Sequence, residues 1–148
     1  IGGSAFSGCS SLTSITIPES VTSIGGWAFS RCSSLTSITI PEGVTSIGGG
    51  AFSDCSSLTS MTIPESVTSI GYGVFSHCSS LENVYCKAIM PPVAKRIGYN
   101  WFTFDNNASG RKIYVPMESV EAYTTADGWA DYADRIVGYD FDNGVVVE

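Results

Sequence analysis

The sequence predicts an α+β repeat solenoid, in which 23-residue units stack to form a parallel sheet closed by a C-terminal strand-helix-strand cap. The first observation is that phenylalanine, cysteine and leucine recur together at this fixed period. Their positions are Phe6, Phe29, Phe52 and Phe75; Cys9, Cys32, Cys55 and Cys78; and Leu12, Leu35, Leu58 and Leu81. The second is a change of composition after the fourth unit. We therefore divide the chain into a repeat array (1–87), a transition segment (88–111) and a capping module (112–148).

Each unit contains one short strand with a defined inward side. In the first unit Leu12, Ile15 and Ile17 are apolar, polar residues separate them, and Pro18 follows. This β-branched pattern with a closing proline predicts a strand. Equivalent strands of successive units must pair in parallel, so that equal positions form columns. The outward column consists of Thr16, Thr39, Thr62 and Tyr85.

The remainder of each unit must return the chain to the next strand. After the proline, Val21, Ile24 and their copies supply further inward residues. We expect the glycines that follow, at 25, 48 and 71, to provide a turn with positive φ. The stretch 28–32 is too short for a stable helix, so we expect one helical turn that places Phe29 inward.

The C-terminal region predicts a cap. Residues 112–116 form a predicted strand, and a helical stretch begins at Glu118, although Gly128 interrupts it. Its apolar residues include Val120, Tyr123, Trp129, Tyr132 and Ile136. A solenoid needs such a cap because its last unit otherwise exposes an apolar face. No equivalent segment precedes Ile1, so we expect upstream repeats or self-association to cover that end.

The repeat resembles a known family. The unit Ile-Gly-x-x-Ala-Phe-x-x-Cys-Ser-Ser-Leu-Thr-Ser-Ile-Thr-Ile-Pro is similar to the BspA-type, or Treponema pallidum-type, leucine-rich repeats of bacterial cell-surface proteins, over residues 1 to about 86. The tail resembles the C-terminal module of Bacteroides-type members, with Tyr114-Val115-Pro116 as one strand and 136–139 as another. The resemblance implies a non-enzymatic, extracellular or cell-surface module that binds host or matrix proteins.

Composition excludes several other classes. The net charge of −7, from 7 basic and 14 acidic residues, lacks the basic footprint of a nucleic-acid partner. No apolar run is long enough to predict a membrane-spanning helix. The chain begins at Ile1 without an apolar signal segment, as a fragment or a processed chain would. The expected location therefore comes from the resemblance.

The cysteine column predicts buried thiols rather than a metal site or a cofactor site. Zinc ligands occur in closely spaced pairs and converge, whereas these cysteines run in a row. Adjacent thiols at the strand spacing are also poorly placed for a disulfide. We expect Cys9, Cys32, Cys55 and Cys78 to be reduced and buried, and Cys86 to lie in the core.

Other polar motifs carry little chemistry. His77 shares a variable column with Gly8, Arg31 and Asp54, so we expect it to be exposed and not catalytic. Residues 140–144 lack the later acidic ligand of a calcium loop, which predicts a polar turn. The glycosylation triplet that begins at Asn107 is of a kind that often occurs by chance.

Residues that depart from the repeat are the candidates for function. Trp27 and Tyr72 stand in a turn where other units have glycine or serine, and Trp101 lies beyond the array. They either contact a partner or only pack along the turn edge and in the cap. The candidate interaction surface comprises Trp27, Tyr72, Arg31, Asp54, His77, Thr16, Thr39, Thr62 and Tyr85. The alternatives to protein binding are a carbohydrate-binding accessory module and a structural stalk.

Overall fold

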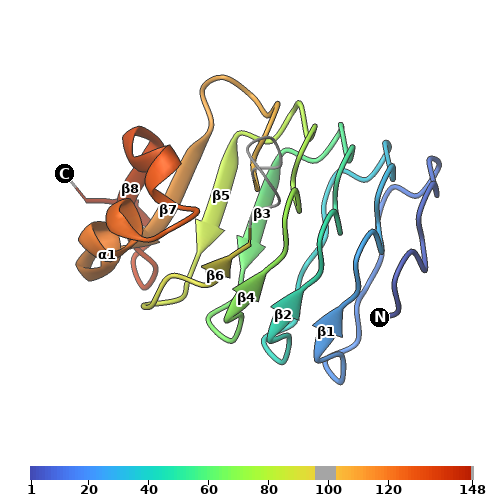
Figure 1. The fold of residues 1–148 in the computed structure, drawn as a ribbon, viewed down its shortest axis with the longest axis horizontal. Helices are drawn as coiled ribbons and strands as arrows, with labels where there is room; N and C mark the ends of the chain where they lie inside the picture. Colours follow the sequence, from blue (N-terminus) through green and yellow to red (C-terminus); the bar gives the residue numbers. More distant parts are fainter. Residues whose placement is uncertain (96–102, 148) are drawn as a thin grey trace.

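A computed structural model describes residues 1–95 and 103–147, and it shows a solenoid of stacked units with a cap at the C-terminal end (Figure 1). Two sheets run along the solenoid and turn one face each toward a shared core. The first sheet has four parallel strands, one per unit. They are β1 (Ser23–Ile24), β2 (Ser46–Ile47), β4 (Ser69–Ile70) and β6 (Val93–Ala94).

The second sheet contains the short strand that the sequence predicts before the proline of each unit. Its order is β3 (Ser60–Ile63), β5 (Asn83–Cys86), β7 (Lys112–Pro116), β8 (Ile136–Asp140) and β9 (Val145–Val146). All neighbours are parallel except β8 and β9. Ser60 pairs with Asn83, which is the 23-residue register, and an isolated bridge from Thr16 to Thr39 continues the pairing into the first units. The predicted parallel stacking is confirmed.

The phenylalanine column forms a continuous stack through the core. Ring centroids are 5.2 Å apart between Phe6 and Phe29, and the following pairs lie 5.4, 5.7 and 5.5 Å apart with nearly parallel planes. The fifth ring belongs to Phe104, which follows Phe75 after 29 residues rather than 23. The repeat geometry thus continues past residue 87, while the division of the chain into three segments stays a prediction.

The stretch around Phe29 differs from the expected helical turn. Phe29 is fully buried as predicted, but Trp27 and Arg31 have φ of 60° and 61°, which no right-handed helix allows. The amides of Trp27, Phe29 and Arg31 donate to the carbonyls of Gly49, Ala51 and Ser53 in the next unit, at 2.8–2.9 Å. A helix would direct these amides into its own turn. Tight turns therefore replace it, because the amides are used between units.

The role expected for Gly25, Gly48 and Gly71 is wrong. None of the three has positive φ; in the second and third units that conformation lies two residues later, at Trp27 and Gly50. The three glycines are needed for close approach instead. A Cβ atom on Gly48 would lie 2.3 Å from the backbone nitrogen of Gly26, and Gly25 and Gly71 meet backbone at 2.5 and 2.3 Å. Glycine here sets how closely successive units stack.

Replacing Gly48 by alanine should lower the free energy of unfolding by about 2 kcal/mol or more, because the new Cβ collides with backbone that cannot move alone. Gly2→Ala is the matched control, since Gly2 has the same position in the first unit and a Cβ atom added there would meet no other atom within 4 Å. That change should stay within about 0.5 kcal/mol. Urea denaturation followed by circular dichroism measures both, and equal effects would contradict the close-approach explanation.

The cap closes the apolar end of the array, as predicted. After β7 a 3-10 helix (Met117–Ser119) leads into α1 (Val120–Thr125), and a second 3-10 helix (Ala130–Arg135) precedes β8. Tyr123 and Trp129 are almost fully buried. The Tyr123 hydroxyl donates to the Ala88 carbonyl at 2.7 Å, and the Trp129 indole donates to the Pro92 carbonyl at 2.8 Å. The cap is therefore held to the segment that follows the fourth unit.

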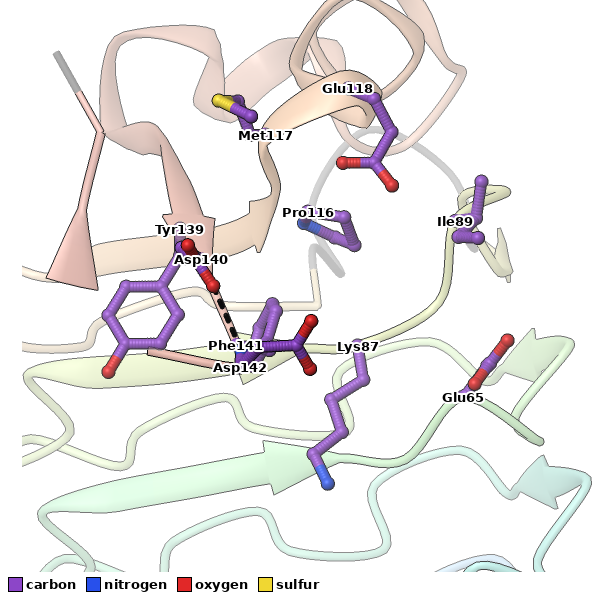
Figure 2. A pocket seen from close by; sticks show the side chains of 10 residues that line it. All are labelled: Glu65, Lys87, Ile89, Pro116, Met117, Glu118, Tyr139, Asp140, Phe141 and Asp142. Carbon is purple, nitrogen blue, oxygen red and sulfur yellow. Dashed lines mark hydrogen bonds between the residues drawn. The ribbon is translucent and has the colours of Figure 1, made fainter. Parts of the chain in front are cut away.

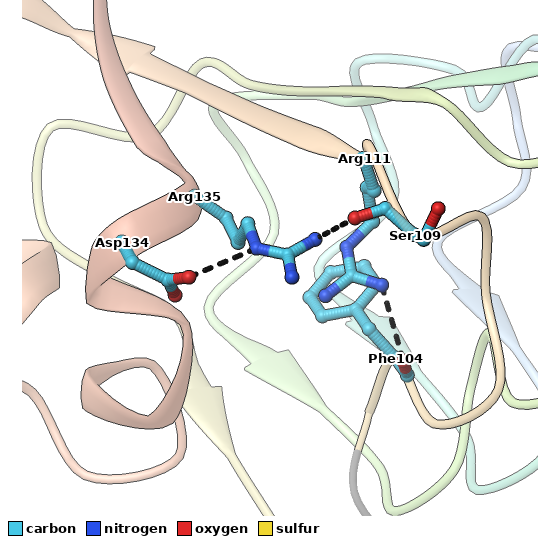
Figure 3. A network of polar contacts seen from close by, with 5 residues as sticks. All are labelled: Phe104, Ser109, Arg111, Asp134 and Arg135. Atoms are coloured by element: carbon cyan, nitrogen blue, oxygen red, sulfur yellow. Dashed lines mark hydrogen bonds and ion pairs between the residues drawn. The ribbon is translucent and has the colours of Figure 1, made fainter.

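Two arginines join the cap to residues 103–111 (Figure 3). The guanidinium of Arg111 is buried between the rings of Phe104 and Tyr132, at 5.1 and 5.2 Å from their centroids. It donates to the Phe104 carbonyl at 3.2 Å, and burial lowers the pKa of Arg111. Arg135 pairs with Asp134 at 3.0 Å and donates to the Ser109 carbonyl. These contacts fix the position of the fifth phenylalanine ring.

Candidate interaction surfaces

The outward face of the second sheet carries the predicted threonine ladder. Thr16, Thr39 and Thr62 are exposed, and Tyr85 in the same column is partly exposed. Its ring stacks on Tyr114 with centroids 4.7 Å apart. Tyr139 lies 5.4 and 5.3 Å from these two rings and 5.0 Å from Phe141. We call Tyr85, Tyr114, Tyr139 and Phe141 the tyrosine cluster; burial and the neighbouring tyrosines raise the pKa of Tyr85.

Sequence reasoning missed three members of this cluster, namely Tyr114, Tyr139 and Phe141. The strand at 112–116 was predicted, but its register was not, because Tyr114 follows Tyr85 after 29 residues. The alternation of Lys112 and Tyr114 with buried Ile113 and Val115 was the available signal. It places Tyr114 on the outward face once β7 is paired with β5.

Trp27 and Tyr72 meet over the middle unit. Their ring centroids are 6.2 Å apart at an interplanar angle of 67°, and both side chains are partly buried. A Cβ atom on Gly50 would lie 2.4 Å from the Trp27 ring, and one on Gly49 would lie 2.7 Å from the Tyr72 ring. The rings thus pack on glycine backbone, as the turn-edge interpretation expects, and a role in partner contact stays a prediction.

Arg31, Asp54 and His77 line one shallow groove of about 530 Å³ with Gly8 and three serines. All three are exposed, as predicted, and have φ of 60–61°, where Gly8 has 78°. Each amide of this column donates to the next unit, which explains the left-handed backbone. Sequence reasoning missed Asn106, which continues the column with φ of 53° and an amide nitrogen 3.0 Å from His77 Nε2.

The predicted surface is therefore divided into three parts. The threonine ladder and Tyr85 lie on the second sheet, and Arg31, Asp54 and His77 line their own groove. A further groove of about 410 Å³ beside the first sheet includes Tyr72 and is lined mainly by serines and glycines. Among the described residues, none lines both grooves. Trp101 lies outside the described residues.

The cysteine column is buried with one exception. The thiols of Cys32, Cys55 and Cys78 donate to the carbonyls of Phe6, Phe29 and Phe52 at 3.1–3.2 Å, so each thiol lies against the preceding unit. Cys9 is exposed, which corrects its expected burial, because it lies in the first described unit and the structure describes no unit packed against its thiol. All five cysteines are free. Within 1–95 and 103–147 no group of three or more metal-ligating side chains is gathered.

Thiol titration with Ellman's reagent should find one fast thiol in the folded protein and all five after denaturation, because Cys9 alone is exposed. Burial raises the pKa of Cys78 to about 12 and that of Cys86 to about 11, so these thiols stay protonated and unreactive at pH 8. Cys9→Ser should remove the fast phase. Any fast-reacting thiol that remains in the Cys9→Ser variant would contradict the stacking of the cysteine column.

Residues 140–144 form the expected polar turn between β8 and β9. The Asp140 carboxylate accepts from the Asn143 side-chain amide at 2.7 Å and from the Asn143 and Asp142 backbone amides. These hydrogen bonds lower the pKa of Asp140. Gly144 completes the turn with φ of 71°.

Asn107, which begins the glycosylation triplet, uses its side chain within the fold, because its side-chain amide donates to the Phe75 carbonyl at 2.6 Å. Among the described residues, no helix has the length and apolar character needed to cross a membrane.

Comparison with known proteins agrees with this geometry. The solved structure of a leucine-rich repeat protein from T. pallidum is 29% identical with a TM-score of 0.64, covering 93% of this chain and 60% of that one. A leucine-rich cell surface protein from Faecalibacterium prausnitzii is 30% identical with a TM-score of 0.59, covering 81% of this chain and 40% of that one. The chain thus spans 60% and 40% of the lengths of these two proteins.

A more distant structure and a family model also match the chain. The pneumococcal vaccine antigen PcpA, at 17% identity and a TM-score of 0.60 over 99% of this chain and 38% of that one, shares the fold. No curated protein matches the chain. A family model described as BspA type leucine-rich repeat region, with six copies, matches residues 1–124. The chain therefore belongs to the BspA-type leucine-rich repeat family.

Proposed function

We propose that this chain is a non-enzymatic binding module, displayed on a bacterial surface or secreted, that contacts a host or matrix protein. Family membership supports a protein-interaction repeat module in general. The F. prausnitzii relative is described as a cell surface protein, which supports the proposed location. The specific partner and adhesion to host or matrix proteins are part of the proposal.

The observation that carries the proposal is the outward face of the second sheet. The threonine ladder there is exposed and ends at the tyrosine cluster, whose rings support one another at 4.7–5.4 Å. Preassembled aromatic side chains lose little conformational entropy on binding, and tyrosine is enriched at the energetic centres of protein interfaces. The face therefore offers a broad, weakly charged contact area rather than a closed pocket.

Carbohydrate binding is the second candidate. Aromatic rings can stack on sugars, and the candidate residues for this role are Trp27, Tyr72 and the threonine ladder. The packing of both rings on Gly49 and Gly50 uses part of their faces within the molecule. This observation favours the sheet face and the protein partner. The remaining candidate residues Arg31, Asp54 and His77 line a separate groove, and the proposal assigns the main contact to the sheet face rather than to this groove.

The test measures binding of the intact chain to a panel of purified matrix proteins by biolayer interferometry, beside a glycan array. For a matrix protein that binds, Tyr85→Ala combined with Tyr114→Ala should weaken affinity about 10- to 30-fold, as loss of central aromatic contacts does. Arg31→Ala with His77→Ala, in the separate groove, is the control and should change affinity less than about twofold. Thr39→Lys combined with Thr62→Lys is a second test of the same face, because the lysine side chains block the outward surface and leave the core unchanged.

Several outcomes would overturn the proposal. If the wild type, the tyrosine variant and the threonine variant bind the matrix protein with equal affinity, the sheet face does not contact the partner. Binding only to glycans, lost in Trp27→Ala combined with Tyr72→Ala, would establish the carbohydrate alternative. Absence of binding in both assays would favour the structural stalk.

A further inference from the structure

A second feature lies at the edge of the sheet that carries the tyrosine cluster. The carboxyl ends of parallel strands meet at one edge, so the residues after β3, β5, β7 and β8 converge there. They line a cleft of about 510 Å³ (Figure 2). Its lining residues are Glu65, Lys87, Ile89, Pro116, Met117, Glu118, Tyr139, Asp140, Phe141 and Asp142.

The cleft carries an excess of negative charge. Four carboxylates line it, and Lys87 is the basic side chain among the described lining residues. The Lys87 amine pairs with Glu42 at 3.2 Å, and Glu42 is not part of the cleft; in Figure 2 the lysine chain extends away from Glu118. Within residues 1–95 and 103–147, no ion pair joins Glu65, Glu118 or Asp142 to a cation. The cleft therefore presents these carboxylates to solvent, and a cationic ligand is complementary to its charge.

The cleft is also lined by apolar groups that water reaches. Ile89 is 52% exposed and Met117 is 54% exposed, although both are large aliphatic side chains. Tyr139 and Phe141 form an aromatic wall, with ring centroids 5.0 Å apart, that continues into the tyrosine cluster. Aromatic faces attract cations, and exposed aliphatic side chains favour an apolar neighbour. Charge, aromatic rings and aliphatic groups thus share one concave site.

We propose that this cleft receives a lysine or arginine side chain of the protein partner, together with an adjoining aliphatic side chain. The inference rests on the proposed function and names the chemistry of the segment that the module recognises. The carboxylates of Glu118 and Asp142 bind the cation, and Ile89 and Met117, at opposite sides of the cleft in Figure 2, offer two apolar contacts for the aliphatic part of the segment. A partner lying on the tyrosine cluster reaches the cleft through Tyr139, which belongs to both surfaces.

The test uses the intact chain and a short fluorescent peptide of alternating lysine and leucine, measured by fluorescence anisotropy. Analogues replace lysine by norleucine, which removes the charge, or leucine by serine, which removes the apolar contact. Glu118→Gln with Asp142→Asn should weaken binding of the basic peptide about fivefold to tenfold. Glu19→Gln with Glu82→Gln is the matched control, because it removes two exposed carboxylates outside the cleft and changes net charge equally.

The control variant should change affinity for the basic peptide less than about twofold. Raising salt from about 50 to about 500 mM should lower the affinity of the wild type for this peptide until it approaches that of the cleft variant. Ile89→Ser with Met117→Ser should weaken the lysine-leucine peptide but not its serine analogue. Equal losses in the cleft and control variants would show general attraction to an acidic protein and overturn the proposal. Equal affinity of the wild type for the lysine peptide and for its norleucine analogue would also overturn the proposal.

The two proposals fail separately. If the cleft variants bind the basic peptide normally while the tyrosine variant loses its matrix protein, the cleft proposal falls and the proposed function stands. If the basic peptide binds through the cleft while no matrix protein binds, the proposed host or matrix partner falls instead.

Discussion

Backbone hydrogen bonds between units, in a fixed 23-residue register, are the interaction on which every other feature of this molecule depends. Amides of the tight turns donate forward to the next unit at 2.7–2.9 Å, and this bonding fixes the left-handed backbone at Trp27 and Arg31. Glycine at 25, 48 and 71 permits the close approach that the bonds need. The phenylalanine stack and the buried thiols then follow, because identical positions must lie above one another.

The same constraint explains why most of the proposed contact residues outside the threonine ladder are ones that do not repeat. Inward positions are fixed by stacking, whereas an outward side chain in the column of Arg31, Asp54 and His77 affects only solvent and its neighbours. Larger changes gather where the period ends. The 29-residue step from Tyr85 to Tyr114 brings a non-repeating strand beside the array, and the tyrosine cluster and acidic cleft both form at that junction.

Much of the fold could be predicted because the period is exact. The Phe29 and Leu35 columns, the outward threonines and the strand at 112–116 all follow from spacing and alternation. The first sheet could not be predicted, since a two-residue strand such as β1 leaves no pattern. Tyr139 and Phe141 were missed because their place depends on how the cap pairs with the array. The site was therefore less predictable than the fold, since contacts across irregular intervals leave no periodic signal.

The most direct test of the register is native-state hydrogen exchange of the amides of Phe29, Phe52 and Phe75, which donate to the next unit at 2.8–2.9 Å. Because these bonds break only when units separate, the three amides should exchange at the rate of global unfolding. They should be about a thousandfold or more slower than the amide of Glu19 in its exposed turn. Exchange of the three phenylalanine amides as fast as that of Glu19 would contradict the stacked register.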